Sequence, residues 1–248
     1  MGGIANLTGF PESIPTKVGP SIADHVAGIY LYVGIATALV HRERTGEGQF
    51  VDVSMIDTIF SLLENSLVKY TMAGYIPERN GNIDPSIAPF DLYECKDGFV
   101  AIGVGNDRLF DIFCHTIGHT ELLEDPRYAT NDLRCKNYQP DLQNVIREWA
   151  KQYTKSEIET IMDEAGIPCG PVLNVKEAIE HPHIQARNMM VHCEHPTAGD
   201  LYFQGVVAKL SETPGEVEFP SPLLGQHNQE IFGITAEEEE KLKAEGVL

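Results

Sequence analysis

Positive charge is scarce in this sequence of 248 residues. Lys and Arg number 18 against 37 Asp and Glu, so the formal net charge is −19. Nucleic acids and anionic membrane surfaces select basic proteins, and no basic stripe can dominate such a surface. The composition therefore argues against both kinds of partner. With 42% hydrophobic and 22% charged residues, the chain is typical of a globular protein with one large domain or two smaller ones.

Cysteine is also sparse: the chain has five, an odd number, and no CxxC pair. This pattern indicates neither a disulfide framework nor a structural zinc site, and it favours a reducing, cytoplasmic location. His115 and His119 have the spacing of a helical metal pair, but the glutamate of an HExxH motif is missing between them. We therefore expect no metal.

The apolar runs of this sequence are shorter than a membrane span. The longest, residues 26–40, falls below the ~18 residues of a membrane span. The first residues lack the cationic and apolar regions of a signal peptide. We expect residues 26–40 to form a helix buried inside the protein, although little chain precedes them to cover it.

Several catalytic and nucleotide-binding motifs are missing. No Walker-type phosphate loop and no GxSxG nucleophile motif occurs, and residues 103–108 lack the third glycine of a dinucleotide fingerprint. The sequence indicates neither a neighbouring base nor an electropositive environment for any cysteine. Pyrophosphate cradling, serine hydrolysis and cysteine nucleophiles are therefore unsupported.

The first part of the chain has the order helix, strand, helix, which indicates an α/β fold. The patterns predict a helix over residues 25–44, a strand over 49–54 and a helix over 55–70. Asp24 stands at the expected N-cap of the first helix. Taken alone it is a cap; beside small residues at the mouth of a buried helix, it is also a candidate carboxylate nucleophile.

The rest of the chain reads as a linker over residues 73–89 followed by a mostly helical module. Residues 90–95 and 99–104 predict a β-hairpin around a Lys-Asp-Gly turn. Capping boxes at Thr154 and Thr235 begin two helices. Further helices are predicted over residues 106–117, 139–153 and 226–232, and strands over 190–192 and 203–210.

Distinctive short motifs are spread along the chain, at residues 18–28, 34–39, 42–55, 86–93, 97–98, 125–128, 134, 165–172, 187–189 and 222–227. Through these motifs the sequence resembles the family III CoA-transferases (CaiB/BaiF family) over essentially its whole length. By this resemblance, Asp24 occupies the position of that family's catalytic aspartate.

The resemblance implies a covalent reaction through an aspartyl-acyl anhydride and an aspartyl-CoA thioester on Asp24. The substrates would be an acyl-CoA and a carboxylic acid, with coenzyme A carried as acyl-CoA. Met55 matches a position that packs against CoA; a core residue at a helix start is the other interpretation. The resemblance further implies a homodimer of interlocked chains.

The fold class it implies is α/β: a partial large Rossmann-like domain plus a small α+β domain. Residues 1–72 and 190–248 would belong to the large domain and 90–172 to the small one, with linkers at 73–89 and 173–189. The chain resembles the C-terminal portion of such proteins, without the N-terminal nucleotide-binding half-domain.

Two alternatives remain open. An acyl-CoA racemase or epimerase of the same superfamily uses the matching aspartate as a base. The other alternative is a catalytically silent fragment. The missing half-domain supports it, as does the net charge of −19, which is poorly suited to binding the phosphates of CoA.

Overall fold

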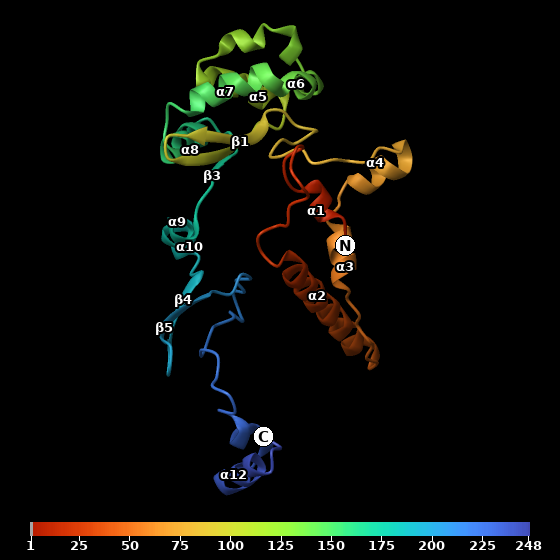
Figure 1. Ribbon diagram of the computed structural model, residues 1–248, viewed down its shortest axis with the longest axis vertical. Helices are drawn as coiled ribbons and strands as arrows, with labels where there is room; N and C mark the ends of the chain where they lie inside the picture. The colour runs from red at the N-terminus through yellow and green to blue at the C-terminus, as the bar shows by residue number, and fades with distance from the viewer. Residues whose placement is uncertain (1) are drawn as a thin grey trace. The chain divides into compact units, whose positions relative to one another are not determined.

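The computed structural model describes residues 2–248. The chain forms two compact units, one ending at Val172 and one over Leu173–Leu248, and each is described here by itself. The first unit begins with four helices (Figure 1): α1 (Ile4–Leu7), α2 (Ile22–Thr45), α3 (Met55–Ser61) and α4 (Ser66–Ala73).

Helix α2 begins three residues before the predicted start, at Ile22, with Ser21 as its N-cap. Its end matches the sequence prediction, since Gly46 adopts φ 80° and donates its N–H to the Arg42 carbonyl at 2.8 Å. Gly34 lets the chain that follows approach closely, because a Cβ there would lie 2.8 Å from Cγ1 of Val51.

The prediction that this apolar helix is buried is wrong for the part of the chain that the structure describes. No residue of α2 is buried, and Tyr32 and Ile29 are 73% and 63% exposed. The physical reason is that α3 is its main packing neighbour, and one short helix covers only one side. By length and composition alone α2 is apolar enough to span a membrane, a test that the core helix of a soluble protein also passes.

Residues 49–54 form no strand, contrary to prediction. A strand needs a neighbour that accepts its ladder of hydrogen bonds, and the structure pairs no described segment with these residues. The predicted helix over 55–70 is also divided. Helix α3 ends at Ser61, Glu64 has φ 48°, and α4 begins at Ser66.

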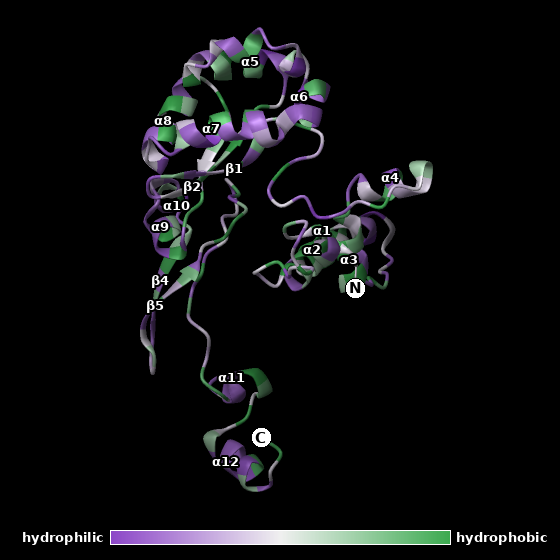
Figure 2. Ribbon diagram, turned by 45° about the horizontal axis from the view of Figure 1, so that its top comes forward, coloured by the Kyte–Doolittle hydropathy of each residue, from purple (hydrophilic) through white to green (hydrophobic). Residues whose placement is uncertain are grey.

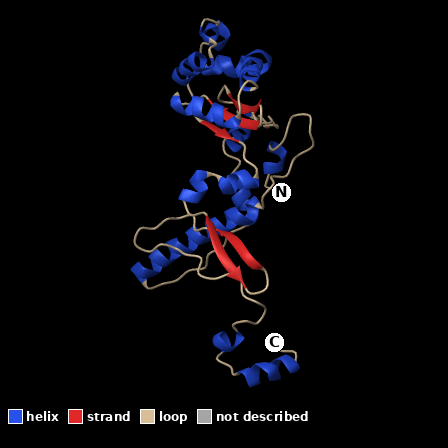
Figure 3. Ribbon diagram, turned by 90° about the vertical axis from the view of Figure 1, so that its left-hand side faces the viewer, coloured by secondary structure: helices blue, strands red, loops and turns tan. Residues whose placement is uncertain are grey.

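A three-stranded antiparallel sheet follows (Figure 3, red), in the order β1 (Phe90–Cys95), β2 (Gly98–Gly103) and β3 (Cys169–Pro171). Cys95 pairs with Gly98 across the turn, and Gly98 has φ 148°. The predicted hairpin is thus confirmed. Strand β3 was not predicted; it pairs Cys169 with Ile102 on the far side of β2.

Helices cover this sheet. They are α5 (Asp107–Ile117), α6 (Asn131–Asn137), α7 (Gln143–Ala150) and α8 (Lys155–Glu164), with short turns η1 (Thr120–Leu123), η2 (Pro126–Tyr128) and η3 (Tyr138–Leu142) between them. Figure 2 shows hydrophobic and hydrophilic turns alternating along α5. Its buried residues include Phe110 and Phe113, and the single tryptophan, Trp149, is 5% exposed in the same core. The core occupies residues 88–167.

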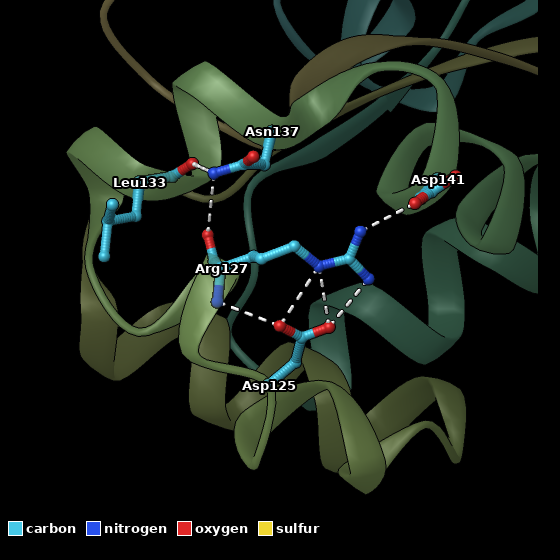
Figure 4. Close-up of polar contacts among 5 residues, drawn as sticks. All are labelled: Asp125, Arg127, Leu133, Asn137 and Asp141. Atoms are coloured by element: carbon cyan, nitrogen blue, oxygen red, sulfur yellow. Dashed lines mark hydrogen bonds and ion pairs between the residues drawn. The ribbon is translucent and has the colours of Figure 1, made fainter.

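Two arginines that carry the family resemblance hold this helical layer together. Arg127 bonds both carboxylate oxygens of Asp125, with its Nη2 at 2.8 Å, and its Nη1 lies 2.7 Å from Asp141 (Figure 4). Arg134 is fully buried and donates to the carbonyl of Ala88 at 2.8 Å. At these two positions the contacts seen are ones that hold the fold together.

The second unit consists of short helices and one hairpin. It contains α9 (Val175–Glu180), α10 (Pro182–Ala186), a hairpin of β4 (Met190–His195) and β5 (Gly199–Gln204), α11 (Asn228–Phe232) and α12 (Ala236–Ala244). The capping box at Thr235 is confirmed. The strand predicted over 203–210 begins earlier instead, because His195 pairs with Gly199 and the second strand starts directly after that turn.

Candidate active site

Asp24 is the third residue of α2, not its N-cap. Ser21 takes the cap position, so the sequence prediction is corrected by one helical turn. At this place the carboxylate lies in the first turn, near the positive end of the helix dipole. Asp24 is exposed, and no group among residues 2–248 hydrogen-bonds its side chain.

A pocket of about 230 Å³ opens at the start of α2 and includes Asp24. Its lining is mostly apolar with three polar residues, the mixture found in small-molecule sites, and its volume lies below the ~300 Å³ at the lower end of such sites. The lining residues are Ile4, Ala5, Lys17, Val18, Pro20, Ser21, Ile22, Ala23, Asp24 and Ile59.

Three segments build this pocket. Helix α1 supplies Ile4, and α3 supplies Ile59, which is 5% exposed. Gly2 lets the chain pass close to α3, since a Cβ there would lie 2.6 Å from Cγ2 of Ile59. The buried Ile59 side chain and the first turn of α2 thus form two walls of the pocket.

Backbone donors are free at the same rim. Ile22 donates its N–H to Pro20 at 2.9 Å and His25 donates to Ser21 at 3.2 Å. The N–H groups of Ala23 and Asp24, within the described chain, have no acceptor. Unpaired first-turn amides are suited to binding a negative oxygen.

Lys17 was not singled out from the sequence, yet the structure brings it to the Asp24 pocket. Its Nζ donates to the Gly19 carbonyl at 3.3 Å. Lys17 is the only Lys or Arg before Arg42, but that position alone does not mark it as a site residue.

Met55 lies outside the pocket lining. It is the first residue of α3, whose N-cap Ser54 accepts the Ile56 N–H at 3.2 Å. Because Met55 is 54% exposed, its interpretation as a core residue is wrong. Its contact with CoA stays a prediction.

A larger cavity of about 530 Å³ lies against β1 and α7. Two buried polar residues line it, Gln143 at 3% and Asp91 at 5% exposure. The Asp91 carboxylate accepts hydrogen bonds from Tyr138 at 3.1 Å, from Gln143 at 2.7 Å and from the Leu92 N–H at 2.8 Å. Because its oxygens are already satisfied by the fold, this carboxylate is not placed to attack a substrate.

The two histidines with metal-pair spacing have other contacts. The His115 ring lies 2.9 Å from the Asp111 carbonyl, and the His119 ring lies 2.7 Å from the Glu121 carboxylate. The hydrogen bond with His119 lowers the pKa of the Glu121 carboxyl. Among residues 2–248, no group of three or more metal-ligating side chains is present.

Comparison with known proteins places the chain. The sequence pattern of CoA-transferase family III matches residues 1–228. The chain belongs to CoA-transferase family III. Within that family, a succinyl-CoA–D-citramalate CoA-transferase of Chloroflexus aurantiacus is 38% identical over 253 residues, which cover 100% of this chain and 63% of that protein. An acetyl-CoA:oxalate CoA-transferase of Acetobacter aceti is 40% identical over 212 residues, covering 85% and 53%.

Solved structures of the family share the fold. A CaiB/BaiF family protein from Brucella suis matches with a TM-score of 0.78 at 31% identity, over 94% of this chain and 60% of that one. The mixed α/β fold is thereby confirmed. The chain spans about three-fifths of the length of the relatives it matches.

Proposed function

We propose that this chain takes part in moving CoA between an acyl-CoA and a carboxylic acid, with Asp24 as the nucleophile. The observation that carries the proposal is a carboxylate without a protein partner, held at a helix N-terminus in a mostly apolar pocket. A carboxylate whose oxygens accept no hydrogen bond from the protein has its lone pairs available for attack on a carbonyl.

In the first half-reaction, an Asp24 oxygen attacks the thioester carbonyl of the donor. The C–S bond breaks, its electron pair leaves on the CoA thiolate, and a mixed anhydride forms. The thiolate then attacks the Asp24 carbonyl carbon, the anhydride C–O bond breaks, and the donor acid leaves as a carboxylate. Asp24 now carries CoA as a thioester.

The second half-reaction runs the same steps in reverse order. The acceptor carboxylate attacks the aspartyl thioester and releases the thiolate, and the thiolate attacks the acceptor's acyl carbon. This restores the Asp24 carboxylate and yields the new acyl-CoA. Each tetrahedral intermediate carries an oxyanion, for which the free N–H groups of Ala23 and Asp24 are candidate donors on this chain.

The substrates are chosen from the relatives. Several transfer CoA from succinyl-CoA to a dicarboxylic acid, as their names state. We therefore propose succinyl-CoA as the donor to assay, with citramalate, mesaconate or glutarate as acceptors.

The test is acyl-CoA exchange by the chain and its Asp24→Ala and Asp24→Asn variants. We expect both variants to lose at least 10³-fold in kcat, because the covalent route is removed. Wild-type protein incubated with succinyl-CoA and hydroxylamine should give an Asp24 hydroxamate, detected by peptide mass spectrometry.

Asp57→Ala is the matched control, since Asp57 is also an exposed carboxylate in the first turn of a helix but lies outside the Asp24 pocket. It should exchange CoA at the wild-type rate. Exchange that survives in Asp24→Ala would overturn the proposal, as would wild-type protein that neither exchanges CoA nor binds it. Solvent deuterium entering the α-carbon would instead support the racemase.

A further inference from the structure

Lys17 is the only cation that lines the Asp24 pocket among the residues the structure describes. The lining otherwise holds apolar side chains, a serine and one carboxylate. Lys17 is exposed to solvent, so an incoming ligand can reach its ammonium group. An ammonium group attracts an anionic group of a ligand by charge and by hydrogen bonds.

The position of Lys17 is fixed by its loop. Thr16 donates its backbone N–H to the Thr8 carbonyl at 3.1 Å, which ties the residue before Lys17 to the end of α1. The Thr8 hydroxyl in turn donates to the Ile4 carbonyl at 2.8 Å, and Ile4 lines the pocket. The lysine therefore emerges from a closed loop anchored on the pocket wall.

The side chain is restrained only weakly. Its one recorded contact is the 3.3 Å hydrogen bond to a backbone carbonyl, and no carboxylate pairs with it among the described residues. An ammonium group has three N–H donors, so donors remain for a ligand. Lys17 can thus bind a carboxylate without first breaking an ion pair.

Dicarboxylic acyl groups carry such a carboxylate. When one carboxyl of a diacid is joined to CoA, the other stays ionised, and it must enter a pocket that already holds the Asp24 charge. Without a cation, the two negative charges repel each other; with Lys17 present, the free carboxylate has a partner. A monocarboxylic acyl group of equal length has no such need.

We propose that Lys17 binds the free carboxylate of dicarboxylic acyl-CoA substrates and so sets a preference for diacids over monoacids. This inference rests on the proposed function of Asp24. It assigns Lys17 a specificity role and no part in breaking or forming bonds.

The experiment compares succinyl-CoA with butyryl-CoA, which have the same chain length and differ in the free carboxylate. In Lys17→Met we expect the KM for succinyl-CoA to rise about tenfold, the usual scale of one charge-assisted contact at a partly exposed site. The KM for butyryl-CoA should stay unchanged, and Lys17→Arg should restore most of the diacid preference.

Lys69→Met is the matched control, because Lys69 lies on α4 and lines a different pocket. Calorimetric titration with succinate and butyrate provides a readout that does not depend on turnover, and only succinate binding should weaken in Lys17→Met. Equal losses for both donors, or no loss for either, would overturn the proposal. Failure of Asp24 as the nucleophile looks different, since exchange would then persist in Asp24→Ala whatever Lys17 does.

Discussion

Arg134 shows what a single buried charge does in this fold. Its side chain is fully buried and donates to the carbonyls of Ala88 and Tyr128 and to the Asp107 carboxylate, while its guanidinium lies 4.4 Å from the Phe110 ring centre. One residue of α6 thus joins the segment before β1, η2 and α5.

Replacing Arg134 by Met should lower the free energy of unfolding by about 2–6 kcal/mol. The change leaves two buried carbonyls without donors, and each such loss destabilises by about 1–3 kcal/mol. Chemical denaturation measures the difference. Arg108→Met, an exposed arginine of α5, should change stability by less than about 0.5 kcal/mol; equal effects of the two substitutions would contradict the role of Arg134.

Residues of the candidate site were predictable only in part. Asp24 stands out through its neighbours in sequence, because small residues precede a long apolar helix. Lys17 does not, because a lone lysine in a Pro- and Gly-rich loop looks like any surface residue until the fold brings α1, its loop and α2 together. The sequence alone does not reveal such a convergence.

Among the elements, α8 tests how far local sequence determines a helix start. The Thr154 side chain accepts the Glu157 N–H at 3.3 Å, and the Glu157 carboxylate accepts the Thr154 N–H at 2.7 Å. The Thr154 N–H and the Thr154 hydroxyl, which donates to the same carboxylate at 3.0 Å, lower the pKa of Glu157. The box was predicted because four adjacent residues form it without outside help.

Thr154→Ala should destabilise the protein by about 1 kcal/mol, the usual loss for an N-cap side chain. Thr160→Ala is its control in the same helix, where the hydroxyl donates to the Ser156 carbonyl inside the helix and alanine is the better helix former. Thermal unfolding of both variants measures the contrast. A Thr160→Ala loss as large as the Thr154→Ala loss would refute a specific capping effect.

Elements that depend on distant partners were predicted less well. The hairpin of β1 and β2 is local and was predicted, with its turn at Gly98. Strand β3 has only three residues, including a glycine and a proline, and becomes a strand because β2 lies beside it. Residues 49–54 show the opposite case: their side-chain pattern suits a strand, but no neighbour pairs with them.

At the scale of the whole molecule, the burial of thiol and phenol groups predicts that the protein loses stability at alkaline pH. Burial raises the pKa of Cys114 to about 12 and that of Cys169 to about 11. It also raises the pKa of Tyr93 and Tyr138. All four groups belong to the first unit.

The direction follows from proton binding. An unfolded thiol ionises near pH 8.5, whereas these folded thiols keep their protons to higher pH, so the unfolded state is favoured as pH rises. The free energy of unfolding should fall from about pH 9 upward, by up to about 1.4 kcal/mol per pH unit for each thiol. Denaturation midpoints between pH 7 and 10 measure this slope.

The Cys114→Ala/Cys169→Ala double variant should show a shallower slope than the wild type, whatever its stability at pH 7. That pH 7 value serves as the internal reference for the cavity left by the substitutions. Parallel slopes in the two proteins would mean that the thiols do not contribute.

Buried residues are concentrated in one part of the chain, and the fluorescence of the single tryptophan reports on that part. Trp149 lies in the core of residues 88–167, with Tyr153 5.1 Å away between ring centres, so its fluorescence follows the unfolding of that core alone. Far-ultraviolet ellipticity also records α2, whose 24 residues lie outside this core. The separation between the two unfolding curves therefore measures how strongly the helix that carries Asp24 is coupled to the core.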